Sequence, residues 1–95
     1  MSHGSREEIK AQRADDPQVQ AGYEQARRAH VIGREVRRQR EAAGLTRRQL
    51  ADRAGMTQSV IARLEAGGTE PTLATSDRVA KALGLQLTIA FQRVA

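Results

Sequence analysis

The sequence contains no cysteine and only two aromatic residues, Tyr23 and Phe91. A chain without cysteine forms no disulfide and no thiolate metal site. Its two histidines, His3 and His30, lie far apart in the sequence, so we expect no bound metal. Proteins that bind RNA or single strands largely stack bases on aromatic side chains. Two aromatic residues are too few for such a platform.

Long apolar runs, leader-like segments and catalytic motifs are missing as well. No apolar run approaches the roughly 18–20 residues that a membrane helix requires. Residues 1–5 lead directly into charged sequence instead of the apolar core of a signal peptide. The sequence has no Ser–His–Asp or Cys–His set and no phosphate-cradling glycine loop. We therefore expect a cytoplasmic protein that is not an enzyme and uses no cofactor.

The chain has an excess of arginine. Sixteen basic residues, fourteen of them arginine, stand against eleven acidic ones and give a net charge of +5. Residues 1–29 are neutral, with five charges of each sign, whereas residues 30–70 carry eight arginines against five acids. This balance favours an anionic partner such as nucleic acid, bound by the middle or C-terminal part of the chain.

Helical patterns occupy the first half of the chain. Asp16 followed by Pro17 is a typical helix start, because aspartate caps the first turn and proline suits its first position. Residues of one face then recur at helical spacing. They are Val19, Tyr23, Ala26 and His30, followed by Ile32, Val36 and Ala43. Only glycines separate the two stripes, so the pattern leaves their boundary near residues 29–31 open.

Three short helices and a strand are predicted in the second half. Thr46 and Gln49 form a capping box ahead of a helix that ends at Gly55. Further helices begin after Thr57 and Pro71. The last segment shows the two-residue period of a strand. Its apolar residues are Leu85, Leu87, Ile89 and Phe91.

A strand needs a partner, and the sequence contains no second strand pattern. One solution is an antiparallel pair between two copies about a two-fold axis. The alternative is that the segment packs on the helices of its own chain. The first solution divides the chain into a helical extension (1–29), a helical domain (30–84) and a C-terminal strand for dimerisation (85–95).

The helix after Thr57 has two contrasting faces. Its apolar stripe contains Leu64 together with Val60 or Ile61. Amide and guanidinium groups, which can pair with base edges in a major groove, lie on the other face. That face consists of Thr57, Gln58, Ser59, Ala62 and Arg63.

Residues 32–84 resemble the helix-turn-helix domain of the XRE family, the Cro and phage-repressor type. The matching residues are Arg40, Gly44-Leu45-Thr46, Gln49-Leu50-Ala51, Gly55, Thr57-Gln58, Ile61, Leu64-Glu65, Gly67 and Pro71. The resemblance implies an all-α, lambda-repressor-like bundle of five helices. It also implies a homodimer that binds double-stranded operator DNA.

The same resemblance implies roles for individual residues. Thr57 would contact a phosphate, and Gln58 would read a base, adenine by its bidentate geometry. Ser59 and Arg63 would reach the next base edges. Arg47 stands where the family usually has glutamine, and it would bind a phosphate or a neighbouring base.

Three further positions concern packing. Arg40 and Glu65 match a pair that forms a partly buried salt bridge in the family. Ser76 stands where the family usually has leucine, which implies looser packing of the last helix.

The wider chain, residues 15–92, is similar to the HigA-type antitoxins within this family. The matching features are Asp16-Pro17, Tyr23, Thr72-Leu73, Ala82-Leu83-Gly84 and the alternating tail. The resemblance implies that the chain neutralises a RelE/HigB-like ribonuclease toxin and represses its own operon. We place toxin binding on the thin apolar face formed by Ile9, Val19 and Tyr23.

The leading hypothesis is therefore a dimeric repressor that serves as the antitoxin of a toxin–antitoxin pair. One alternative is a stand-alone or phage regulator with the same DNA-binding domain and no toxin. Another is an adaptor whose helical fold binds protein or RNA. The scarcity of aromatic residues and the polar, cationic recognition face argue against the adaptor.

Overall fold

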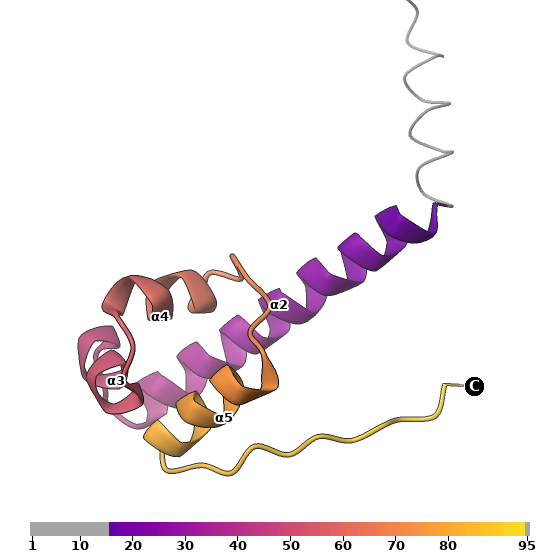
Figure 1. The fold of residues 1–95 in the computed structure, drawn as a ribbon. Coiled ribbons are helices and arrows are strands. Elements are labelled where there is room, and N and C mark those ends of the chain that lie inside the picture. The colour runs from indigo at the N-terminus through magenta and orange to yellow at the C-terminus, as the bar shows by residue number, and fades with distance from the viewer. Residues whose placement is uncertain (1–15, 95) are drawn as a thin grey trace, which may run out of the picture.

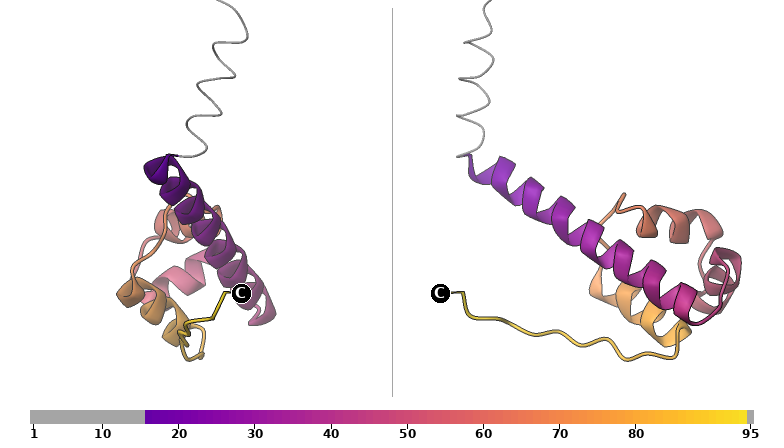
Figure 2. Two further views of the ribbon diagram at one scale, coloured as in Figure 1. Left: turned by 90° about the vertical axis from the view of Figure 1, so that its right-hand side faces the viewer. Right: turned by 180° about the vertical axis from the view of Figure 1, so that it is seen from behind.

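The computed structural model describes residues 16–94. They form four helices in the order α2 (Pro17–Ala42), α3 (Arg47–Ala54), α4 (Gln58–Glu65) and α5 (Leu73–Ala82). The three short helices gather around the C-terminal half of α2 (Figure 1). The N-terminal half of α2 extends beyond them, as the right-hand view of Figure 2 shows. The expectation of an all-α fold is confirmed for this part of the chain, in which no helix is long and apolar enough to cross a bilayer.

Two details of the expected fold differ. The resemblance implied five helices, whereas residues 16–94 contain four, because the stripes on either side of residues 29–31 lie on the single helix α2. The strand expected at residues 85–95 is not formed by residues 85–94, which run as an extended tail (Figure 1). A strand requires a neighbouring strand to complete its hydrogen bonds, and the rest of the described chain is helical or loop.

The core lies where α3, α4 and α5 meet α2. Leu50 and Ile61 are fully buried, and Ala51 and Val79 pack with them. Full burial of a large aliphatic side chain contributes about 1.5–3 kcal/mol. Of the two candidates in α4, Ile61 is the buried one, since 44% of Val60 remains exposed.

Helices α2 and α4 approach each other closely at Gly33. A Cβ atom at this position would overlap the carbonyl oxygen of Leu64 and lie 2.8 Å from that of Glu65. Both atoms belong to the α4 backbone, so a side chain at position 33 would push α4 away. Gly33 therefore sets how deeply α4 sits against α2.

The substitution Gly33→Ala is expected to lower the free energy of unfolding by about 1–3 kcal/mol, because the added methyl overpacks the contact. Gly22 provides a matched control on the same helix, since nothing lies within 4 Å of a Cβ added there. Gly22→Ala should stabilise the protein by roughly 0.5–1 kcal/mol. Urea denaturation measures both effects. Equal stability of Gly33→Ala and wild type would contradict the close approach.

Candidate nucleic-acid interface

Local capping fixes the limits of α3 and α4. The expected capping box is present at the start of α3, where the Thr46 amide donates to the Gln49 side chain (2.8 Å) and the Gln49 amide to the Thr46 hydroxyl (3.1 Å). Gly55 ends α3 in the left-handed conformation, with φ 68°. Thr57 then caps α4 by accepting a hydrogen bond from the Val60 amide (3.2 Å). α3 thus begins and ends where the sequence pattern predicts, and α4 begins where it predicts.

α4 has a buried face and an exposed one. Ile61 and Leu64 point into the core. The aliphatic part of Arg63 lies against Gly68, where an added Cβ would be 3.0 Å from Arg63 Cγ. This packing places the Arg63 stem along the loop that follows α4. Four of the side chains predicted to contact DNA are exposed on or beside α4: Thr57, Gln58, Ser59 and Arg63.

Arg78 of α5 secures the turn between α3 and α4. Its Nη2 donates to the carbonyl oxygens of Ala54 and Gly55, both at 2.9 Å. These are carbonyls at the end of α3 that the helix itself leaves without partners. Sequence reasoning missed this residue, because an arginine 23 positions away from the turn carries no local signal.

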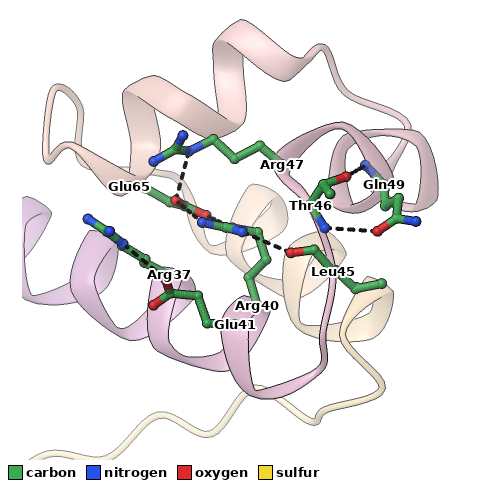
Figure 3. A network of polar contacts seen from close by, with 8 residues as sticks. All are labelled: Arg37, Arg40, Glu41, Leu45, Thr46, Arg47, Gln49 and Glu65. Atoms are coloured by element: carbon green, nitrogen blue, oxygen red, sulfur yellow. Dashed lines mark hydrogen bonds and ion pairs between the residues drawn. The ribbon is translucent and has the colours of Figure 1, made fainter.

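A shared carboxylate joins α2, α3 and the end of α4 (Figure 3). Glu65 accepts two hydrogen bonds from Arg40, from Nε at 2.6 Å and from Nη2 at 3.1 Å. The remaining Arg40 nitrogen, Nη1, donates to the Leu45 carbonyl (2.8 Å). Both charged side chains are nearly buried, with 10% of Arg40 and 2% of Glu65 exposed. The hydrogen bond to Glu65 raises the pKa of Arg40 above its ordinary value. The pair therefore ties α2 to the helix that carries the exposed polar face.

Arg47 is the third member of this group. Its Nε donates to Glu65 (3.1 Å), and 42% of its side chain is exposed. Its two terminal nitrogens make no hydrogen bond with the residues that the structure describes. Because one carboxylate serves two guanidinium groups, the group keeps a net positive charge. The resemblance assigned Arg47 to phosphate or base contact, and the structure places its Nε on Glu65 with the donors of both terminal nitrogens available.

Exposed arginines without an ion-pair partner occur on more than one helix. On α2, Arg37 pairs with Glu41 and Arg38 with Glu35, whereas Arg27 and Arg34 are exposed and form no ion pair within residues 16–94. Residues 47–65, which span α3 and α4, carry four arginines and two acidic residues. Three of these arginines are exposed and form no ion pair within residues 16–94: Arg48, Arg53 and Arg63. This pair of helices thus presents uncompensated cationic charge.

The remaining predicted site residues lie away from α4. Val19 and Tyr23 are 43% and 66% exposed on the N-terminal half of α2. Ile9, predicted to belong to the same apolar face, lies outside the described residues. The four apolar residues predicted for dimerisation are on the extended tail: Leu85, Leu87, Ile89 and Phe91.

A model of the HTH_3 family, described as helix-turn-helix, matches residues 36–89. The chain is also similar to an uncharacterized HTH-type transcriptional regulator, y4dL, of Sinorhizobium fredii, with 41% identity over 59 residues. That match covers 62% of this chain and 30% of the relative. A second uncharacterized HTH-type transcriptional regulator, from Methanothermobacter thermautotrophicus, is 43% identical over 49 residues, which are 52% of this chain and 71% of that protein. The chain thus spans less than a third of the first relative's length.

Proposed function

This chain belongs to the HTH_3 family of helix-turn-helix proteins, and from that premise we propose that it is a homodimeric, sequence-specific repressor of transcription. The observation that carries the proposal is the exposed polar and cationic face of α4 on a rigidly braced helix. The second helix of such a motif lies in the major groove, with its N-terminal residues on base edges. Arginines of α3 and α4 supply the attraction to phosphates.

Each side chain of this face has donors or acceptors suited to one part of DNA. Gln58 lies in the first turn of α4 and can pair with adenine N6 and N7 through its amide. Arg63 can donate to guanine O6 and N7, and the Ser59 hydroxyl can form a hydrogen bond with either adenine or guanine. Thr57 precedes the helix and contacts a phosphate. The domain is formed by residues 30–84, with the extension 1–29 before it and the dimerisation segment 85–95 after it.

Selection of bound duplexes from a randomised DNA library tests the proposal. We expect enrichment of a two-fold symmetric site whose half-sites lie about 34 Å apart. Affinity for that site should fall steeply as the salt concentration rises, because phosphate contacts release counterions. Enrichment of no common sequence would contradict sequence-specific binding.

We assign Arg47 to a phosphate, which its terminal nitrogens reach while Glu65 holds its Nε. Arg47→Gln introduces the residue usual at this position in the family and removes one cation. The slope of log affinity against log salt should decrease by about 2, because the bound dimer loses one phosphate contact in each protomer and each contributes about 0.9, with the preferred sequence unchanged. Arg38→Gln, which removes an exposed arginine paired within α2, is the control. An unchanged slope for Arg47→Gln would show that Arg47 does not contact DNA.

We also propose that the N-terminal half of α2 binds a RelE/HigB-like toxin, so that the repressor acts as its antitoxin. Two observations support this part of the proposal. The first turns of α2 extend beyond the bundle (Figure 2), and they expose Val19 and Tyr23. Exposed apolar anchors at helical spacing are typical of helices that lie in a partner's groove.

Co-expression with the reading frames that flank the gene tests toxin binding. A small basic protein that arrests growth is expected, and the wild-type chain should relieve the arrest. Tyr23→Ser should relieve it less, whereas Arg63→Ala should still relieve it while losing operator binding. If no flanking frame arrests growth, the chain is a stand-alone regulator.

A further inference from the structure

An apolar groove of about 720 Å³ lies between α2, α5 and the tail. Its walls include Val31 and Val36 of α2, with Leu73 and Ser76 of α5. Ser76 stands where the resemblance places a leucine. Because serine is the smaller side chain, the groove is deeper at this position than it would be with leucine. Leu73 is 64% exposed and Val31 54%, so the described residues leave this groove largely uncovered.

The tail beside the groove lacks backbone hydrogen-bond partners and exposes apolar side chains. Among the described residues, positions 86–94 form no backbone hydrogen bond, and the last one in this region runs from the Leu85 amide to the Ala80 carbonyl (2.8 Å). Leu87 is half-buried, whereas Leu85 is 41% exposed, Ile89 60% and Phe91 103%. The tail is thus an extended segment with free backbone groups and an uncovered apolar end.

We propose that a second copy of this chain covers the groove, with the two tails paired as antiparallel strands about a two-fold axis at Thr88. This inference rests on the dimer of the proposed function and assigns its register. In this register Leu85 lies opposite the partner's Phe91, and Leu87 opposite the partner's Ile89. Each apolar side chain of the tail then has an apolar side chain across from it.

Other registers pair fewer of the apolar residues of the two tails with one another. A shift of one position places apolar residues opposite polar ones and on the wrong face of the ribbon. A shift of two positions leaves Phe91 opposite the end of α5, or Leu85 opposite Arg93. Only the axis at Thr88 pairs all four apolar residues of both tails.

The register also explains what fills the groove. The partner's Phe91 lies beside Leu85, where the tail leaves α5 and lines the groove. Aromatic side chains bury large areas and dominate the energetics of interfaces. A two-stranded ribbon alone is only marginally stable in water. Insertion of each Phe91 against the other copy's α2 and α5 supplies the apolar contact that the ribbon lacks.

Cysteine cross-linking of the full chain tests the register, because the wild-type sequence contains no cysteine. In Thr88→Cys the two new thiols face each other, with Cβ atoms about 4.5–5.5 Å apart. Mild oxidation is expected to convert most of this variant into a disulfide-linked dimer. In the control Gln92→Cys the thiols are eight positions apart along the ribbon, roughly 26 Å, and the variant should stay unlinked. Circular dichroism checks that both variants are folded.

Two results would overturn the proposal. One is efficient cross-linking of Gln92→Cys with none of Thr88→Cys, which requires another register. The other is a wild-type chain that is monomeric by light scattering at micromolar concentration. The selection of DNA sequences separates this failure from that of the proposed function. If the chain is a monomer but still selects a single half-site, the ribbon is wrong and sequence-specific DNA binding stands. If Thr88→Cys forms the cross-linked dimer but selects no sequence, the ribbon stands and the proposed function is wrong.

Discussion

Replacement of Glu65 by alanine is expected to lower the free energy of unfolding by roughly 3–5 kcal/mol. The substitution leaves the guanidinium of Arg40 nearly buried without its carboxylate, and breaking a buried pair in this way is strongly destabilising. It also removes the hydrogen bond that links Arg47 of α3 to the end of α4. Thermal denaturation measures the effect, since each kcal/mol lowers Tm by about 4–8 °C in a domain of this size.

Glu35→Ala is the matched control for this prediction. Glu35 also pairs with an arginine, Arg38, but both side chains are more than half exposed. Exposed pairs of this kind contribute about 0–1 kcal/mol. If Glu65→Ala lost no more stability than Glu35→Ala, the buried pair would not brace α4 as we describe.

Arg63→Ala is expected to weaken binding to the selected operator by roughly 1–3 kcal/mol for each half-site and to relax the preference for guanine at one position of each half-site. The loss follows from removal of a bidentate donor on the exposed face of α4. Because Arg63 makes no ion pair with described residues and contacts the loop only through its stem, the fold should be retained. Fluorescence anisotropy against the operator and single-base variants measures affinity and specificity together.

Arg38→Ala separates base reading from loss of charge. It also removes one arginine, from the exposed surface of α2. It should alter affinity for operator and for unrelated DNA by a similar, small factor. An Arg63→Ala protein that behaves like Arg38→Ala would assign Arg63 to the phosphate backbone.

Features with local causes were predictable from the sequence. The box of Thr46 and Gln49 and the left-handed Gly55 depend on residues within one turn, so the limits of α3 and α4 followed from pattern alone. The alternation of the tail indicated an extended segment. Its partner could not be deduced, because strand pairing is completed by a second backbone that one chain does not supply.

Contacts across long sequence separations escaped prediction from pattern. Arg78 reaches the turn at Gly55 from α5, and Arg47 meets Glu65 from 18 positions away. Neither contact has a fixed spacing or a characteristic neighbour. The pair of Arg40 and Glu65 was anticipated only through the resemblance to a family.

Titration of the isotopically labelled chain with its selected operator, followed by NMR, tests the central claim most directly. We predict that the largest shifts fall on the amides of Gln58 and Ser59 and on the Nε–Hε group of Arg63. Residues 17–21 of α2 should remain unchanged, because they lie beyond the part of α2 that contacts the loop after α4. Shifts concentrated on residues 17–21, with α4 unaffected, would contradict recognition of DNA by α4.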